Sequence, residues 1–344
     1  MNKIKFSVIS LSLMLFTFTS CKKDDAVTVE TENYKGIVVI NEGGFNKSNG
    51  SVGIYKPGTK TYFDAFKKAN DRPLGDVVQS ISEINDKYFI VVNNSNKIEV
   101  VNKVDFKSAA VISTPSPRYV LKVSNDKAYV TNFSSNTVKI LNLKTNSLNG
   151  NIDIHSTSDQ MALLGSKVYV ATLANKIKVI KVDGDSLKDS LVTSSGLNKV
   201  INFGTNRLAI LCTGTVDWSS GAVIENGKIC FLQKDSTKFE REITLSTGSY
   251  GGSLIYNASS GYLYYSLGNN VIKKVDNNGN VTEFVTLPGT GSVYGLSVGK
   301  NGEIMVTDAG DFNSNGKVYI YSTDGVKISE FNAGIAPNAA FNNE

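Results

Sequence analysis

A repeat of forty residues constrains the fold of this chain more than any other feature of its sequence. Three segments begin at Asp86, Asp126 and Ser166: "DKYFIVVNNSNKIEVVN", "DKAYVTNFSSNTVKILN" and "SKVYVATLANKIKVIKV". Each contains two alternating runs of β-branched and aromatic residues joined by a short Asn/Ser/Ala turn, which predicts a β-hairpin. A smaller apolar run precedes each hairpin and a fourth run follows it. Four antiparallel strands per repeat are typical of a propeller blade.

Weaker copies extend the repeat toward both ends of the chain. They centre on "RLAILCT" with "KICFLQK", "YLYYSLG" with "VIKKVD", and "EIMVTDA" with "KVYIYST". A first unit, "GIVVINEGG" with "SVGIYKP", lacks an inner strand before Gly36, and "GIAPNAAFN" near the C-terminus has the pattern of that missing strand. We therefore predict an all-β, seven-bladed β-propeller over residues 36–344. A C-terminal strand completes its first blade, which leaves no open sheet edge at the seam.

The first residues have the pattern of a secretory signal. Lys3 and Lys5 precede an apolar run over residues 6–18, which is shorter than the roughly 20 residues of a spanning helix. The stretch "FTFTSCKKDD" resembles a bacterial lipobox, in which Cys21 would carry the lipid, and the acidic residues after it resemble an export signal to the cell surface. We expect a lipoprotein signal peptide over 1–20 and a tether over 21–35. The alternative is an ordinary signal peptide with an incidental Cys21.

Charge and cysteine content exclude several classes of protein. The formal net charge is +5, with two of the lysines inside the expected signal peptide and no basic block elsewhere, so nucleic acid is not an expected partner. Besides Cys21 the chain has only Cys212 and Cys230, which are neither a disulfide framework nor a metal cluster. If Thr213 opposes Lys228, the two thiols are nearly opposite. They could then form a disulfide, or remain free as packing residues.

The lengths of the loops distinguish the two faces of the predicted propeller. In a four-stranded meander, the loop between the second and third strands and the connection between blades emerge on one face. This loop-rich face carries the extensions "EGGFNKSNG", "KKANDRPLGD", "TGTVDWSSGAVIENG" and "TDAGDFNSNG". The opposite face has only short turns such as "SNDK" and "GTN". Because binding groups concentrate on loops held by a rigid scaffold, we expect ligand binding on the loop-rich face.

Polar and aromatic residues recur where each inner strand is expected to begin. They include Asp76, Asp159 and Asn198, and their mostly amide and aromatic character suits an organic ligand better than a cation. The alternative is that they only satisfy backbone groups there. Trp218, in the longest insertion, is either a local plug or a contact residue. The residues that we expect to bind a ligand are Gln79, Arg118, Gln160, Trp218, Tyr250, Tyr294 and Asn338.

Three further features are weaker candidates for function. Asp311 begins the calcium-loop spacing D-x-[DN]-x-[DN]-G, but the twelfth position is Ser322 instead of Glu, so we favour turn chemistry with Gly316 in a left-handed conformation. Phe45 and Phe312, at loop tips of adjacent blades, are expected to pack against each other, with a shared ligand wall as the alternative. The only histidine, His155, is expected in a surface loop. We therefore expect no enzyme, no catalytic or metal site and no cofactor.

Several phrases also resemble one family. "VVINEGGFNKSNGSVGIY", "PLGDVVQSI", "SPRYVLKVSNDKAYVTN" and "VTDAGDF" are similar to surface-lipoprotein propellers related to YVTN-repeat, YncE-like proteins of the DUF5074 type. The resemblance implies a lipid-anchored protein at the cell surface of the outer membrane, with membrane contact only through its anchor. It implies capture of a polar ligand, with cobalamin or another corrinoid as candidate, for a TonB-dependent transporter. The alternative is an adhesion or scaffold propeller with a protein or glycan partner, because this fold does not dictate function.

Overall fold

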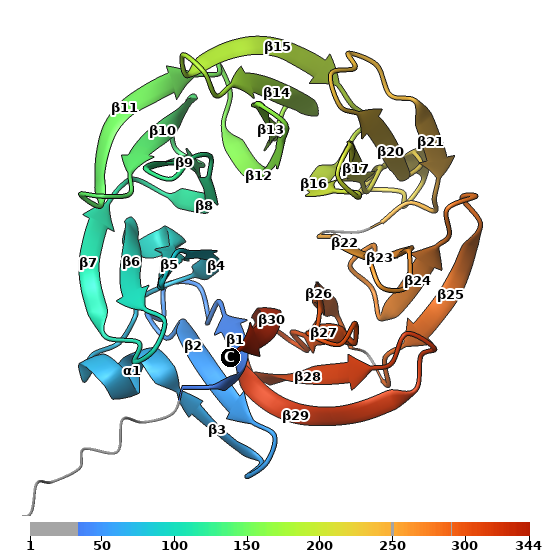
Figure 1. Ribbon diagram of the computed structural model, residues 1–344. Coiled ribbons are helices and arrows are strands. Elements are labelled where there is room, and N and C mark those ends of the chain that lie inside the picture. Colours follow the sequence, from blue (N-terminus) through green and yellow to red (C-terminus); the bar gives the residue numbers. More distant parts are fainter. Residues whose placement is uncertain (1–33, 249–250, 290) are drawn as a thin grey trace, which may run out of the picture. The chain divides into compact units, whose positions relative to one another are not determined.

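The computed structural model describes residues 34–248, 251–289 and 291–344. These residues form seven four-stranded antiparallel sheets arranged around a ring, as the blades of a β-propeller (Figure 1). The predicted fold class is confirmed. The expected signal peptide, Cys21 and nearly all of the tether lie outside the described residues. Within the described part of the chain, no helix is long and apolar enough to cross a membrane.

The blades follow one another in chain order, and the strands of each blade run from the inner to the outer one. Blades 1 to 3 are β30 (Pro337–Asn343), β1 (Gly36–Asn41), β2 (Ser51–Lys56), β3 (Thr61–Asp64); β4 (Val78–Ile84), β5 (Lys87–Val92), β6 (Lys97–Asn102), β7 (Ser108–Ser113); and β8 (Pro117–Lys122), β9 (Lys127–Asn132), β10 (Thr137–Asn142), β11 (Ser147–Asp153). Blades 4 and 5 are β12 (Ser158–Leu164), β13 (Lys167–Thr172), β14 (Lys176–Lys181), β15 (Ser186–Val192); and β16 (Leu197–Asn202), β17 (Arg207–Cys212), β20 (Lys228–Gln233), β21 (Arg241–Thr244). Blades 6 and 7 are β22 (Ser253–Asn257), β23 (Tyr262–Ser266), β24 (Val271–Val275), β25 (Val281–Thr286); and β26 (Val293–Val298), β27 (Ile304–Asp308), β28 (Asn315–Tyr321), β29 (Lys327–Ile335).

The C-terminal strand closes the ring as predicted. β30 pairs antiparallel with β1, so the last strand of the chain is the inner strand of blade 1. Asn343 fixes this strand from both sides: its Oδ1 accepts a hydrogen bond of 2.7 Å from the Tyr88 hydroxyl, and its Nδ2 donates one of 2.7 Å to the carbonyl of Tyr34. These buried bonds join β30 to blade 2 and to the start of the propeller.

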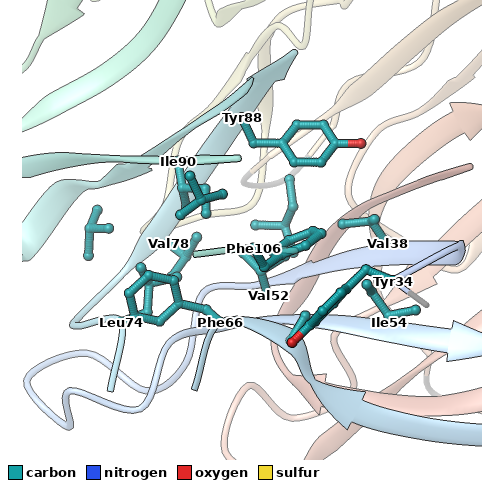
Figure 2. Packing of buried hydrophobic residues seen from close by; sticks show 14 residues of the cluster. Tyr34, Val38, Val52, Ile54, Phe66, Leu74, Val78, Tyr88, Ile90 and Phe106 are labelled. Atoms are coloured by element: carbon teal, nitrogen blue, oxygen red, sulfur yellow. The ribbon is translucent and has the colours of Figure 1, made fainter. Parts of the chain in front are cut away.

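The second strand of each blade is the most buried, because the neighbouring blades cover both of its faces. β5 and β13 are buried at every position but the first, and their sequences are continuous apolar runs. Figure 2 shows the cluster between blades 1 and 2, which contains Val38 and Val52 of blade 1 and Ile90 of blade 2. Each such side chain stabilises the fold by roughly 1.5–3 kcal/mol on burial.

The connection from blade 1 to blade 2 contains a short helix, α1 (Ala65–Asn70), where the sequence indicated only an extended loop. Asp64 caps it by accepting a hydrogen bond of 2.9 Å from the amide of Lys67. Beyond the helix, Arg72 forms an ion pair of 2.6 Å with Glu99, which is fully buried on β6. Although burial opposes its charge, hydrogen bonds from Arg72, Ser108 and Lys97 keep the pKa of Glu99 below its ordinary value. The connection is therefore held firmly against blade 2.

Candidate functional site

The inner strands surround a cavity of about 1020 Å³. Residues of the inner strands line its wall, and Trp218 and Phe312, from loops between second and third strands, line its mouth. The cavity therefore opens on the loop-rich face. A volume of this size is at the upper end of the range for sites that enclose small organic ligands.

A β-bulge near the start of the inner strand recurs in six of the seven blades. The pairing register between inner and second strand shifts there in β4, β8, β12, β16, β26 and β30. The inner-strand residues that lie between the paired positions on either side of each shift are Gln79, Arg118 with Tyr119, Asp159 with Gln160, Asn198, Tyr294 and Asn338. All of them line the cavity. A bulge leaves its extra residue unpaired and re-aims the side chain, so these bulges direct the polar residues toward the axis of the ring.

The backbone just before several of these strands supports the bulges. A residue with left-handed φ directly precedes β4, β8, β16 and β30; these are Val77, Ser116, Gly196 and Ala336. Gly196 adopts this conformation without steric cost, whereas Val77, at φ 55°, is β-branched and strained there. Strain of this kind persists only where the surrounding structure enforces it, and it is concentrated at functional sites.

The structure brings together six of the seven residues that the sequence predicted as ligand-binding. Gln79, Arg118, Gln160, Trp218, Tyr294 and Asn338 all line the cavity. Tyr250 lies outside the described residues. Asp76, which the sequence pattern grouped with them, is not in the cavity wall. Its Oδ2 accepts hydrogen bonds of 2.9 Å from the Asn46 amide and 2.6 Å from Asn94, so it fixes neighbouring loops.

Arg118 is held in place by blades on both sides. Its Nε and Nη2 each donate a hydrogen bond of 3.2 Å to the carboxylate of Asp159, and its Nη1 donates to Oε1 of Gln79. The guanidinium also lies 4.4 Å from the ring centroid of Phe133. Burial opposes the charge, but Asp159, Tyr119 and Glu42 together outweigh it and raise the pKa of Arg118 above its ordinary value. The guanidinium is thus a charged, pre-oriented part of the cavity wall.

Glu42 is a cavity residue that the sequence did not indicate, because it follows a second strand and not an inner one. Its Oε2 accepts a hydrogen bond of 2.8 Å from the Tyr294 hydroxyl, and its Oε1 accepts one of 3.0 Å from Asn338. Burial raises the pKa of Glu42; the two hydrogen bonds and the positive charges of Arg118 and Lys199 offset this effect only in part. A carboxyl group in the cavity wall is therefore easier to protonate than an ordinary glutamate.

Lys199 is the second charged residue that the sequence did not indicate. It lines the cavity from β16, and no carboxylate of the described residues forms an ion pair with it. Asn198 and Asn338 each have a buried side-chain oxygen without a hydrogen-bond partner among the described residues. Glu42 and Asp159 balance Arg118 and Lys199 in formal charge, and the ammonium group of Lys199 is available to a ligand.

Aromatic side chains lie at the mouth of the cavity. Trp218 is 71% exposed, in the insertion that carries β18 (Thr215–Val216) and β19 (Val223–Glu225), which favours the contact residue over the buried plug. Phe312 packs edge-on against Tyr294, with ring centroids 5.0 Å apart. The expected packing of Phe312 on Phe45 is therefore wrong: Phe45 is 69% exposed, and it is not in the cavity wall.

The loop at Asp311 has the hydrogen bonds of a turn. Oδ1 of Asp311 accepts hydrogen bonds from the amides of Asn313 and Ser314, at 2.9 and 2.7 Å. The part of the chain that the structure describes contains no cluster of three metal-ligating side chains. The expected left-handed Gly316 is wrong, because the left-handed residues of this loop are Gly310 and Phe312. Gly316 is needed for close packing instead: a Cβ there would lie 2.4 Å from Cδ of Pro337.

The remaining candidates lie outside the cavity. His155 is exposed between β11 and β12, as expected, with Nδ1 3.1 Å from Asp153.

Cys212 and Cys230 are free and buried. Lys228 pairs with Cys212 and not with Thr213, so the expected register is wrong by one residue. The two cysteines are therefore diagonal neighbours on one face of the sheet, and a hydrogen bond from Cys230 lowers the pKa of Cys212.

Comparisons with known proteins agree with the fold. A family model described as "Domain of unknown function (DUF5074)" matches residues 35–335. No curated protein matches the chain. A quinonprotein alcohol dehydrogenase-like protein from Bacteroides thetaiotaomicron is similar in structure, with a TM-score of 0.69, 15% identity, and coverage of 90% of this chain and 79% of that one. The hydrazine synthase of Kuenenia stuttgartiensis has a TM-score of 0.61 and 15% identity, over 74% of this chain and 86% of that one. The computationally designed Ika8 protein has a TM-score of 0.58 and 13% identity, over 89% of this chain and 90% of that one. At these identities the similarity shows the fold alone.

Proposed function

The chain belongs to the DUF5074 family, and we propose that it captures a small or medium-sized polar molecule in the central cavity of its propeller. The observation that carries this proposal is the set of six bulges, each of which places a polar or aromatic side chain on the cavity wall. A purely structural role for these residues would not require the register of so many strands to shift at the same place. The proposal includes no catalytic step.

The wall suggests the chemistry of the ligand. Trp218, Tyr294 and Phe312 provide aromatic surface for an apolar body, while amide groups deeper in the cavity provide hydrogen bonds. The ammonium of Lys199 requires an acceptor or an anion. A ligand with a large partly apolar body, several amide or hydroxyl groups and at most a small negative charge satisfies all of these groups.

The finer proposal follows the resemblance seen in the sequence. A corrinoid such as cobalamin meets this chemical description, and the residues around Cys21 resemble a lipobox with a surface-export signal. The protein would then be lipid-anchored at the cell surface, where it would deliver its ligand to a TonB-dependent outer-membrane transporter. Its only contact with the membrane would be through the acyl chains at Cys21.

Calorimetry with the purified full-length protein in detergent tests this function. Cyanocobalamin and other corrinoids that differ in their lower ligand are titrated into wild type and into Lys199→Gln, with Lys234→Gln on the opposite face as the matched charge control. We expect one saturable site per chain, weakened by the change at Lys199 and unaffected by the change at Lys234. If no corrinoid binds, the ligand assignment is wrong. If binding is equally weakened by both changes, the cavity is not the site.

Exposed apolar residues on the loop-rich face favour a second candidate function. The loops between second and third strands expose the large apolar side chains Phe45, Phe133, Leu173, Trp218, Val223, Ile224 and Phe312. An adhesion or scaffold propeller would use such residues against a protein or glycan partner. A neighbouring gene for an outer-membrane transporter would favour ligand capture. Binding of a macromolecule with an empty cavity would favour the alternative.

A further inference from the structure

We propose a second binding site, for a small carboxylate or phosphate compound, on the face opposite the loop-rich one, between blades 5 and 6. A cavity of about 270 Å³ lies there, with Arg207 and Arg241 among its lining residues. Its residues come from strands β17, β20 and β21 and from the turns between first and second and between third and fourth strands, including Glu240 before β21 and Asp276 after β24. It shares no residue with the central cavity, so it is independent of the function proposed above.

The floor of this second site is rigid. The rings of Phe203 and Phe231 are buried and lie 5.4 Å apart, and Phe203 packs edge-on against Tyr256 of blade 6 at 4.7 Å. These contacts belong to the hydrophobic cluster between the two blades. The floor is therefore fixed by the same packing that joins blade 5 to blade 6.

The two guanidinium groups lie on this floor. Arg207 is 4.7 Å from the ring centroid of Phe203, and Arg241 is 5.2 Å from that of Phe231. Stacking on a ring uses the flat face of a guanidinium and leaves the N–H groups at its edge available. Nη1 of Arg241 donates a hydrogen bond of 2.9 Å to the carbonyl of Asn277, which fixes its orientation across the blade boundary. A Cβ at position 279 would lie 2.0 Å from Nη2 of Arg241, so Gly279 leaves room for this arrangement.

The nearby carboxylates do not saturate these donors. Oε1 of Glu240 is 3.6 Å from Nη1 of Arg207, which is an ion pair but is beyond hydrogen-bond distance. Asp276 directs its two oxygens to the amide and side chain of Asn280, at 2.8 Å each. Those bonds lower the pKa of Asp276. In the described structure the guanidinium of Arg207 therefore has no hydrogen-bonded acceptor, and a planar oxyanion would supply one.

The lining also limits the ligand. Guanidinium forks match the geometry of carboxylates and phosphates, and Glu240 offers an acceptor to a hydroxyl or ammonium group beside the anion. The volume is below the usual range for drug-sized molecules, which limits the ligand to about the size of a monosaccharide. We infer that the site prefers a small hydroxy or amino acid, such as a sugar acid, over a neutral sugar.

Calorimetry on the full-length protein tests this site with three named probes: glucuronate, glucose and inorganic phosphate. We expect glucuronate to bind saturably and at least about tenfold more tightly than glucose, because only glucuronate has the charged acceptor for the guanidinium groups. Glu240→Gln should strengthen inorganic phosphate, which is no longer repelled, and should strengthen it more than glucuronate, whose hydroxyls exchange a charged acceptor for a neutral amide oxygen. If phosphate alone binds and Glu240→Gln does not change its affinity, the ligand class is wrong.

Variants separate this site from nonspecific attraction. Arg207→Gln with Arg241→Gln should weaken glucuronate at least about tenfold. Lys234→Gln removes a positive charge on the same face outside the lining, and it should change nothing. Arg241→Lys keeps the positive charge but lacks the forked N–H groups of the guanidinium, so it should bind glucuronate with an intermediate affinity. It replaces the double variant in this test if the double variant melts at a lower temperature. Equal losses with Lys234→Gln, or no saturable binding of any probe to wild type, would overturn the proposal.

Discussion

The hydroxyl of Tyr294 donates a hydrogen bond of 2.8 Å to Oε2 of Glu42, across 252 residues of the chain. Tyr294 is the second residue of the inner strand of blade 7 and Glu42 follows the second strand of blade 1, while Asn338 on β30 donates to the other oxygen of Glu42. One carboxyl group thus joins the first blade, the last blade and the closing strand. The same carboxyl group also lines the cavity.

The stability of the protein should depend on pH through Glu42. Since burial raises its pKa above 4.5, the folded state binds this proton more tightly than the unfolded state. Stability from this group is therefore complete below pH 4.5 and is lost as the pH rises through the raised value. Glu42→Gln mimics the neutral form and should avoid this loss. Melting temperatures measured from about pH 4 to about pH 7 should show a difference, variant minus wild type, that increases with pH.

Tyr294→Phe serves as the control for this pH dependence. It removes one hydrogen bond to Glu42 but keeps the carboxyl group, so it should lower stability by roughly 1–3 kcal/mol and preserve the pH dependence. A difference between Glu42→Gln and wild type that is constant would mean that folding does not shift the pKa of Glu42, and one that decreases with pH would mean that folding lowers it.

Ring closure should depend on the C-terminal strand. Deleting residues 335–344 removes β30, which leaves β1 as an open inner edge and removes the contacts of β30 with blades 2 and 7. We expect cooperative thermal unfolding, followed by circular dichroism, to be lost or to fall steeply. Asn343→Ala is the milder control: it keeps the strand but breaks the bonds to Tyr88 and Tyr34, and it should cost about 1–3 kcal/mol without loss of cooperativity. A truncated chain that melts as wild type does would refute closure by this strand.

The architecture was predictable from the sequence because the repeat encodes it directly. A period of forty residues with alternating apolar runs specifies a blade, and seven such units with one displaced strand specify a closed ring. The helix α1 was not predictable, because "AFKKAN" is short and its stability comes from the cap at Asp64 and from packing of Phe66, which is fully buried. The predicted register around Cys212 was also wrong, because a loop with its own small sheet, β18 and β19, separates the paired strands β17 and β20.

The site was predictable in part. Residues such as Gln79 and Asn338 were recognisable because they are polar and lie near the start of an inner strand, at equivalent places in the repeat. The bulges that turn them toward the cavity left no sequence signal, since they depend on backbone conformation at residues as different as Val77 and Gly196. Glu42 reaches the wall from a neighbouring second strand, so no argument based on inner strands could include it.

The two buried cysteines should remain reduced. Cys212 and Cys230 lie diagonally, since Cys212 pairs with Lys228 and Ile210 pairs with Cys230. In the variant Cys21→Ala, which has no other thiol, alkylation without reductant should be slow in the folded protein and modify both cysteines after denaturation. Mass spectrometry counts the modified thiols. A requirement for reductant would show that a disulfide forms in spite of this register.

The membrane anchor should depend on Cys21, which lies outside the described residues. If Cys21 carries acyl chains, Cys21→Ala should release the protein from the outer-membrane fraction, because these chains are the only membrane anchor in this proposal. External protease added to intact cells should degrade the wild-type protein and spare a periplasmic control. Resistance of the wild type would place it on the inner side of the membrane and would contradict capture at the cell surface.

Ligand affinity should depend on the loop-rich face. Trp218 is 71% exposed at the mouth of the cavity, so Trp218→Ala should leave the free energy of unfolding within about 0.5 kcal/mol of wild type. As a hot-spot residue it should still cost roughly 2 kcal/mol of binding free energy, about thirtyfold in affinity. Asn125→Ala and Ser166→Ala, in turns of the opposite face, are the matched controls and should bind as wild type does. Calorimetry with the identified ligand measures all three.

Variants of Arg118 test whether the ligand contacts its guanidinium group or whether this group only holds the cavity wall in place. Arg118→Gln removes the guanidinium that donates to Asp159 over 3.2 Å and to Gln79. Both the affinity for the ligand and the free energy of unfolding should therefore decrease. The double change Arg118→Gln with Asp159→Asn removes both charges and should restore much of the stability, because no buried charge is left unpaired. If the ligand contacts the guanidinium, affinity should remain low in the double variant. Recovery of affinity together with stability would instead make Arg118 a structural residue, and the ligand contacts would have to lie with Trp218 and Lys199.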